Sequence, residues 1–185
     1  MVLESARRLF TRAEYHQLGA AGIIGPDERV ELLDGQILVK PVIGARHGGC
    51  VNRLAQMLFG ALSDRAVVTV QNPVTLDDLS EPEPDLSLAR PRHDFYSDEH
   101  PTPDELYLVI EVAESSALSD RNRKIPRYAT AGIPEAWLVD LESGRLEVYR
   151  GPSPDGYTSR TDITEGDVSP EAFPDVTIAV TDILG

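Results

Sequence analysis

The run ELYLVIEVA (residues 105–113) constrains the fold most, because it is apolar almost throughout. A strand that is covered on both faces has such a sequence, whereas a strand with one face in water alternates apolar and polar residues. We therefore expect a central β-strand here. A helical segment follows SSALSD (115–120) and ends near Ala131, before Gly132 and Pro134, and a second apolar run, AWLVD (136–140), comes after it. Strand, helix and strand in succession predict a parallel crossover, which is right-handed in nearly all proteins.

Patterns elsewhere in the chain predict a mixed sheet with helices against it. The spacing of Thr11 and Glu14 is that of a capping box and predicts a short helix to about Leu18. Asp34-Gly35, between two β-branched and aliphatic runs, is the strongest short-range signal for a hairpin, here over residues 28–40. Apolar residues recur every three to four positions over 46–62, which predicts a long amphipathic helix. Further strands are expected at 66–70, 73–76, 85–89 and 145–150, with edge strands near 156–162 and 176–180.

Chain length and composition narrow the class of protein. A chain of 185 residues suits one hydrophobic core, so a single domain over 1–185 is expected, of the α/β class with an N-terminal hairpin. The first twenty residues lack the apolar region of a signal peptide, and no segment is apolar enough to span a membrane. Cys50 is the only cysteine, which excludes an internal disulfide and a cysteine-based zinc site. These features predict a cytoplasmic protein without a membrane partner.

The net charge of −14, from 31 acidic and 17 basic residues, bears on nucleic-acid binding. Proteins that hold DNA tightly usually present a basic surface, since release of counterions from phosphates supplies most of the non-specific affinity. A broad phosphate-binding surface is therefore not expected. Any nucleic-acid role must depend on local basic patches, on dimer geometry or on contacts through a metal ion.

Three carboxylates lie within apolar runs and are candidate site residues. Glu111 interrupts the central strand near its carboxyl end, where ligand sites gather in open α/β sheets. Asp85 begins the strand after the extended segment PEP, and Glu31 lies in VELL of the hairpin. Each acid taken singly could instead face solvent or pair with a base at a sheet edge. Together they would repel one another unless a divalent cation lay between them, and their oxygen donors favour Mg²⁺ or Mn²⁺ over zinc.

Lys124 lies on the helix that follows the Glu111 strand, on roughly one face with Arg121 and Tyr128. An ammonium group that reaches the carboxylates could orient an attacking water or stabilise charge on a phosphoryl oxygen. The plain alternative is a solvated basic face on this helix. Arg121 and Arg123 on the same segment are candidate substrate-binding residues, as is His47 at the start of the long amphipathic helix, although a histidine there could equally cap that helix.

The chain resembles the Uma2-like proteins, also called the domain of unknown function 820 family, within the PD-(D/E)XK nuclease superfamily. The resemblance covers about residues 11–184. It is carried by VELLDGQIL, the helix opening with His47, PEPDLSL, LVIEVAESS and DRNRKIPRYATAGIPEAWLVD. The last two blocks, in that order and spacing, are specific to the family, whereas the hairpin alone is a weak signal. The resemblance implies a restriction-endonuclease-like core with a magnesium-dependent site that cleaves phosphodiester bonds.

The resemblance also implies roles for single residues. By position, Glu31 resembles the acid of the first motif region, Asp85 the motif aspartate, and Glu111 the acid of the ExK element. The sequence departs from the superfamily two residues later, where Ala113 stands in place of lysine, and Lys124 resembles the relocated lysine of this family. One or two Mg²⁺ ions would then be held by the first three acids and the main-chain carbonyl of Val112, with Lys124 beside the nucleophile.

The implied activity leaves three functions open. The first is a metal-dependent DNA endonuclease acting as a homodimer, because related superfamily members often cut duplex DNA as pairs. The second is a metal- or DNA-binding regulatory protein that keeps the fold without turnover, which the acidic composition favours. The third is a metal-dependent hydrolase of RNA or of a nucleotide.

Overall fold

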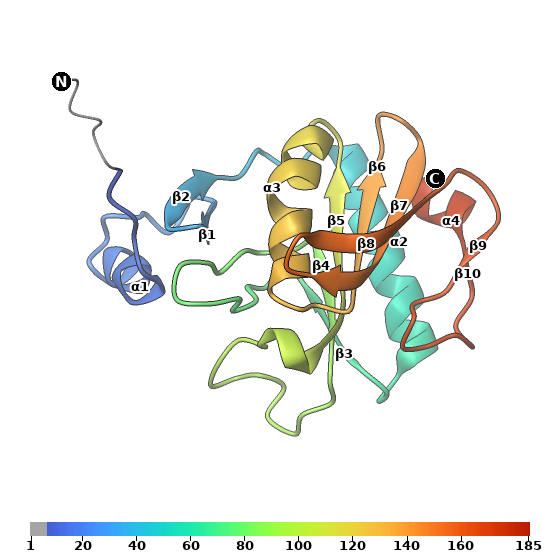
Figure 1. Ribbon diagram of the computed structural model, residues 1–185, viewed down its shortest axis with the longest axis horizontal. Helices are drawn as coiled ribbons and strands as arrows, with labels where there is room; N and C mark the ends of the chain where they lie inside the picture. The colour runs from blue at the N-terminus through green and yellow to red at the C-terminus, as the bar shows by residue number, and fades with distance from the viewer. Residues whose placement is uncertain (1–6) are drawn as a thin grey trace.

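The computed structural model describes residues 7–185, and its centre is a six-stranded mixed sheet with the order β3-β4-β5-β6-β7-β8 (Figure 1). Within the described residues, β5 and β6 are the parallel pair of this sheet, and α3 (Ala117–Thr130) connects them. The parallel crossover expected from the two apolar runs is therefore confirmed. The strands are β3 (Val67–Val70), β4 (Leu86–Ala89), β5 (Leu106–Ala113), β6 (Glu135–Asp140), β7 (Arg145–Ser153) and β8 (Gly156–Ile163).

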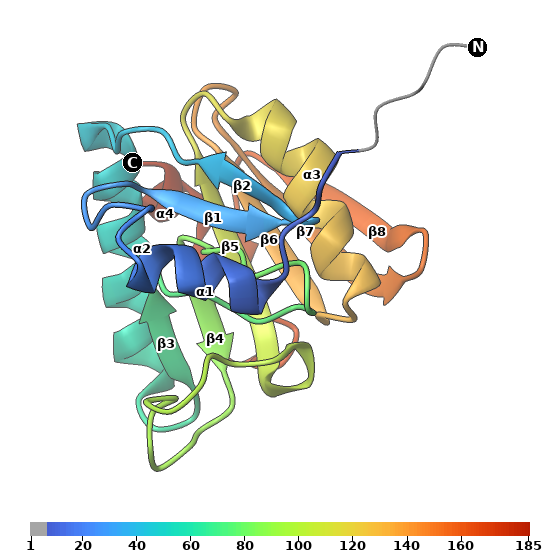
Figure 2. The same cartoon turned by 90° about the vertical axis from the view of Figure 1, so that its left-hand side faces the viewer.

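Helices cover both faces of the sheet, which explains why β5 is apolar at almost every position. Leu108 and Ile110 face the side of α2 (Ala45–Leu62) and α4 (Val180–Leu184), whereas Val109 and Ala113 face α3 (Figure 2). The predicted mixed sheet flanked by helices is confirmed. Side chains of a strand alternate between its two faces, so Glu111, two residues from both Val109 and Ala113, directs its side chain to the α3 face.

The N-terminal part of the described chain lies outside this sheet. The helix α1 (Arg12–Ala20) begins with the predicted capping box, in which the Glu14 amide donates to Thr11 Oγ1 and the Thr11 amide donates to the Glu14 carboxylate. The strands β1 (Val30–Leu33) and β2 (Gln36–Val39) form a two-stranded sheet of their own, as predicted. Asp34 and Gly35 close it with φ values of 50° and 70°, the left-handed pair that a two-residue hairpin turn requires.

Gly35 permits the close contact that attaches the hairpin to the chain before α1. A Cβ at Gly35 would lie 2.5 Å from Leu9 Cβ, while a Cβ at Gly22, which has nearly the same φ (+69°), would meet nothing within 4 Å. We expect Gly22→Ala to lower the free energy of unfolding by about 1–2 kcal/mol through its left-handed backbone. Gly35→Ala should lower the free energy of unfolding by roughly 1–3 kcal/mol more than Gly22→Ala does, because its new methyl group overpacks against Leu9. Urea denaturation of the two variants measures the difference, and equal losses would contradict the contact.

Three sequence predictions of secondary structure are corrected. Residues 73–76 form no strand, because the segment turns back on itself and the Leu76 amide donates to the Ser80 carbonyl. The strand expected at 176–180 is reduced to β10 (Ile178–Ala179), which pairs with β9 (Asp167–Val168), and Val180 starts α4. The helix α3 starts at Ala117 rather than after Asp120, since Ala117 and Leu118 are strong helix formers and extend it by one turn.

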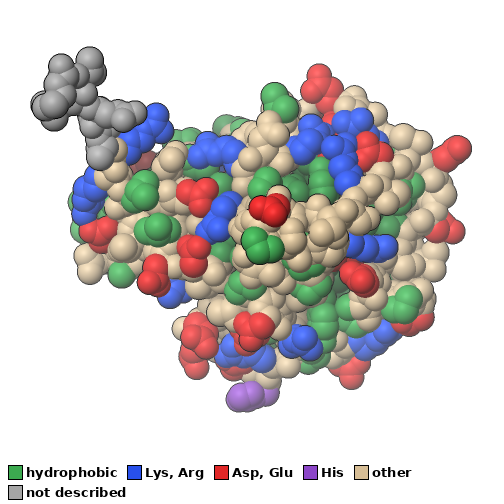
Figure 3. All heavy atoms as spheres, viewed as in Figure 1, with side chains coloured by type: hydrophobic (Ala, Val, Ile, Leu, Met, Phe, Trp, Pro, Cys, Tyr) green, Lys and Arg blue, Asp and Glu red, His purple; other side chains and the backbone are tan. Residues whose placement is uncertain are grey.

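The surface of the described residues carries both charges. Figure 3 shows acidic and basic side chains interspersed over one face. Within residues 7–185 no helix is both long and apolar enough to cross a bilayer. A short 3₁₀ helix, η1 (Pro103–Glu105), precedes β5 and was not predicted.

Candidate active site

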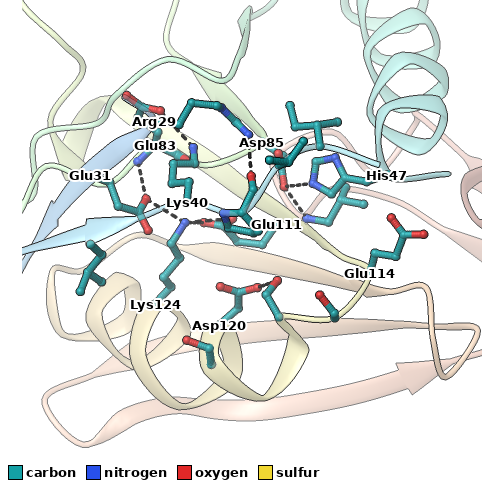
Figure 4. Close-up of a pocket in the computed structure, with 18 of the residues that line it drawn as sticks. Arg29, Glu31, Lys40, His47, Glu83, Asp85, Glu111, Glu114, Asp120 and Lys124 are labelled. Atoms are coloured by element: carbon teal, nitrogen blue, oxygen red, sulfur yellow. Dashed lines mark hydrogen bonds and ion pairs between the residues drawn. The ribbon is translucent and has the colours of Figure 1, made fainter. Parts of the chain in front are cut away.

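A pocket of about 260 Å³ lies at the carboxyl end of β5 (Figure 4). Its wall comprises parts of the hairpin, the loop before α2, the start of α2, the residue before β4 and the first turns of α3. The acidic residues that line it are Glu31, Glu83, Asp85, Glu111, Glu114 and Asp120. The basic ones are Arg29, Lys40, Arg123 and Lys124, together with His47.

Lys124 joins two of the predicted acids at the centre of this pocket. Its Nζ lies 2.9 Å from Glu31 Oε2 and 3.1 Å from Glu111 Oε1. The three residues are buried, with 6%, 4% and 4% of their surface exposed for Lys124, Glu31 and Glu111. This burial excludes the solvated helix face considered for Lys124. It also excludes the solvent-facing strand positions considered for Glu31 and Glu111. The hairpin, the central strand and α3 each contribute one member of this cluster.

The electrostatics of the cluster follow from burial. Burial raises the pKa of Glu111, and the neighbouring Lys124 ammonium opposes that rise. Burial by itself would lower the pKa of Lys124, but the carboxylates of Glu111 and Glu31 raise it above its usual value. Tyr128, one helical turn beyond Lys124, donates its hydroxyl proton to Glu111 Oε1 at 2.5 Å. Lys124 is therefore a cation throughout the physiological pH range.

Asp85 lies on the same face of the sheet as Glu111. The antiparallel register pairs Leu86 with Ile110, which puts Asp85 opposite Glu111, and both line the pocket. Asp85 Oδ2 accepts the Val112 amide at 2.8 Å and lies 3.2 Å from His47 Nε2. Although burial raises its pKa, the hydrogen bonds from His47 and from the Val112 amide lower the pKa of Asp85 overall. Its hydrogen-bonded carboxylate is therefore ionised at neutral pH.

The main-chain carbonyl of Val112 is directed toward Asp85. The Ala113 carbonyl accepts the Leu141 amide on the β6 side of β5. Since successive residues of a strand direct their carbonyls to opposite edges, that of Val112 is directed to the β4 side, where Asp85 accepts the Val112 amide. Three oxygen donors, from Asp85, Glu111 and Val112, thus face one corner of the pocket.

The donor chemistry of the pocket fits a hard divalent cation. Carboxylates outnumber the lysines and arginines of its wall, and no cysteine lines it. Burial raises the pKa of Asp120, the Lys124 ammonium and the Ser116 hydroxyl oppose that rise, and the carboxylates of Glu31 and Asp85 add to it. In the described residues no three His, Cys, Asp or Glu side chains are arranged to hold a metal ion, and Glu31 and Glu111 are joined through Lys124 instead.

The three predicted substrate-binding residues have different positions. His47 lines the pocket beside Asp85, and its Nδ1 is buried without a hydrogen-bond partner among the described residues. Arg123 lies at the pocket rim, with its guanidinium 3.3 Å from Gln36 Oε1. Arg121 is not among the residues that line the pocket, and its guanidinium binds the fully buried carboxylate of Glu147 on β7.

Three residues that contact members of the site were assigned no role in it from the sequence. Asp120 lies four residues before Lys124 in α3, so helical spacing alone would have placed it beside the lysine. Tyr128, which its spacing placed on the Lys124 face, is fully buried, and its hydroxyl binds Glu111. Gln71, which donates to Asp85 Oδ1 at 3.2 Å, follows β3 and carries no local signal of this contact.

Comparisons with known proteins agree with this architecture. The model of the Uma2 family, described as "Putative restriction endonuclease", matches residues 12–181. A search of curated proteins finds no match. The chain is also similar to a crystal structure from Anabaena variabilis ATCC 29413, described as "a putative nuclease belonging to DUF820", with a TM-score of 0.68 and 16% identity over 84% of this chain and 89% of that one. This structural likeness shows the fold, and the family match over nearly the whole length shows that the chain belongs to the Uma2 family.

Proposed function

We propose that this protein is a divalent-metal-dependent DNA endonuclease that hydrolyses phosphodiester bonds. The observation that carries the proposal is the convergence of Glu31, Asp85, Glu111 and Lys124 in one pocket at the end of the central strand. Membership of a family described as "Putative restriction endonuclease" supports nucleic acid as the substrate.

The acids and one main-chain group would hold the cation. Asp85, Glu111 and the Val112 carbonyl face the same corner of the pocket, and Glu31 lies across Lys124 from them. A Mg²⁺ or Mn²⁺ ion at such a site supplies Lewis-acid stabilisation of the charge on a phosphoryl group. The His47 ring beside Asp85 fixes the orientation of that carboxylate.

Lys124 would act through its charge. Because the flanking carboxylates raise its pKa, its ammonium does not serve as a general base near neutral pH. It can donate a hydrogen bond to an attacking water or to a phosphoryl oxygen, where a fixed cation in a buried site stabilises developing negative charge. Glu31 and Glu111 position the ammonium for this role, and Tyr128 holds Glu111 in turn.

A non-catalytic metal- or DNA-binding protein is the second candidate. Two observations favour it: Ala113 stands where the superfamily has its lysine, and Lys124 is already bound to two carboxylates. Under this alternative the protein binds a cation without cleaving nucleic acid. Hydrolysis of RNA or of a nucleotide is the remaining alternative from the sequence.

A plasmid-nicking assay tests the proposal. We expect the purified protein to convert supercoiled plasmid to the nicked form with Mg²⁺ or Mn²⁺, and EDTA to abolish the conversion, because the acids of the pocket need a cation to bind a phosphate. Intact plasmid in every metal and salt condition, together with a metal-dependent rise in melting temperature, would favour the binding protein. Intact plasmid with cleaved RNA or nucleotide would favour the third function.

Three expectations from the sequence stay predictions. They are the homodimer, the cytoplasmic location and the single domain over residues 1–185. Sedimentation of the purified protein with and without duplex DNA measures the first of them.

A further inference from the structure

Most arginines of this acidic chain are paired with carboxylates. Those with a carboxylate oxygen within ion-pair distance are Arg8, Arg12, Arg65, Arg92, Arg121, Arg127, Arg145, Arg150 and Arg160. Six arginines have none within residues 7–185, and two of these six, Arg29 and Arg123, line the active-site pocket. Arg29 donates to the Pro41 carbonyl at 2.7 Å, and Arg123 donates to the Gln36 side chain at 3.3 Å. Among the described residues, each of these two guanidinium groups thus has only a neutral acceptor.

The two arginines lie at opposite ends of the β1–β2 hairpin. Arg29 immediately precedes β1 and contacts the chain just after β2, whereas Arg123 contacts Gln36, the first residue of β2. Gln36 and Pro41 are five positions apart in the sequence, which is roughly 16 Å at about 3.3 Å per residue of extended chain. Glu31 lies between these ends, opposite Leu38 in the hairpin, and its carboxylate reaches Lys124. The carboxylate cluster is therefore flanked by two uncommitted cations.

We propose that Arg29 and Arg123 bind phosphates of one nucleic-acid backbone on either side of the carboxylate cluster. The inference rests on the proposed function and specifies its substrate as a polymer. Guanidinium groups bind phosphates through two parallel hydrogen bonds, which are about twice as strong as bonds to neutral acceptors. A phosphate therefore displaces the Pro41 carbonyl and the Gln36 amide as partner of these arginines.

The separation of the two arginines selects against a small substrate. Along a duplex, whose axis rises about 3.4 Å per base step, roughly 16 Å spans several steps, so the two arginines would contact different phosphates. The phosphate of a mononucleotide reaches one arginine but not both. The same arrangement explains how a chain with a net charge of −14 holds a polyanion, since the contacts are confined to the rim of one pocket.

Salt-dependent DNA binding tests this inference without requiring cleavage. The affinity for a short fluorescent DNA duplex is measured in EDTA over a range of KCl concentrations, for wild type and for Arg29→Gln, Arg123→Gln and the double variant. Each lost phosphate contact should reduce the slope of log K against log salt by about 0.9, and the double variant by about twice that amount. Arg29 is half-buried and Arg123 exposed, so the melting temperatures should stay near that of the wild type.

Arg90→Gln is the matched control. Arg90 also lacks a carboxylate within ion-pair distance in the described residues, but it donates to the Asp104 carbonyl and lies outside the pocket. Its substitution removes the same charge and should leave the slope unchanged. The inference would be overturned if the slope of log K against log salt were the same for the wild type and for the variants of Arg29 and Arg123. It would also be overturned if the wild type bound no DNA at low salt. DNA binding that depends on Arg29 and Arg123, without nicking in any metal, would instead refute the endonuclease proposal and support the inference.

Discussion

Replacing Lys124 by methionine is expected to lower the free energy of unfolding by about 3–5 kcal/mol at neutral pH, the usual cost of leaving a buried charge without its partner. Glu31 and Glu111 both contact the Lys124 ammonium and are almost completely buried. Methionine has a similar length and leaves no cavity, so the loss reports on charge rather than on packing. Urea denaturation in EDTA measures it, and nicking activity should be lost with it.

The loss should shrink as the pH falls. In the wild type, burial already raises the pKa of Glu111, and removing the opposing ammonium raises it further. The folded variant then binds a proton more tightly than the unfolded chain does, so its stability rises as pH falls from the raised folded pKa toward the unfolded value of about 4.3. We expect Lys124→Met to be closest to wild type near pH 5 and furthest from it near pH 8.

A double variant separates charge from misfolding. Lys124→Met with Glu111→Gln removes one of the unpaired carboxylates and should recover part of the stability at pH 8, while remaining inactive. A deficit that does not change with pH, or a double variant no more stable than Lys124→Met alone, would contradict the ion-pair account.

The second large effect is expected at Asp85. Asp85→Asn keeps the shape of the side chain and an oxygen that can accept the Val112 amide, but it removes the negative charge beside Glu111. A metal ion contributes several kcal/mol of transition-state stabilisation, so we expect the nicking rate to fall roughly a thousandfold. The rise in melting temperature with Mn²⁺, which for the wild type reports binding to the folded state, should also disappear.

Asp64→Asn is the control for this substitution, since Asp64 is exposed and lies outside the pocket. It should change neither the nicking rate nor the thermal shift. If Asp85→Asn keeps its activity within about tenfold of the wild type, a difference of about 1.4 kcal/mol, Asp85 is not a metal ligand.

The parts of the fold that the sequence predicted are those with a strong local signal. The run 105–113 and the AWLVD segment identified the parallel pair, and Asp34-Gly35 identified the hairpin. The strand expected at 73–76 was wrong because a β-branched composition does not reveal whether a neighbouring strand lies alongside. The segment instead folds back on itself through the contact of Leu76 with Ser80.

The site was predictable where a carboxylate interrupts an apolar run. Glu31, Asp85 and Glu111 were found in this way, and all three line one pocket. The same signal was overlooked at Glu147 in RLEVYR, which is fully buried and takes Arg121 away from the pocket. The partner of a buried charge depends on which strands become neighbours in the sheet. The linear sequence does not specify which residues of different strands come close in space.

The hairpin that carries Glu31 has a consequence for how the site is kept together. Its strands pair with each other and with no strand of the large sheet among the described residues. They contact loops and helices instead, through the bridge of Leu32 to Glu81, the Gly35 amide on the Leu79 carbonyl and the ion pair of Glu31 with Lys124. The buried Leu32 and Leu33 belong to neither hydrophobic cluster of the large sheet. Segments attached in this way open at a lower free energy than the central strands. We therefore expect two stages on warming: the hairpin detaches first, which separates Glu31 from Lys124, and the large sheet melts at a higher temperature.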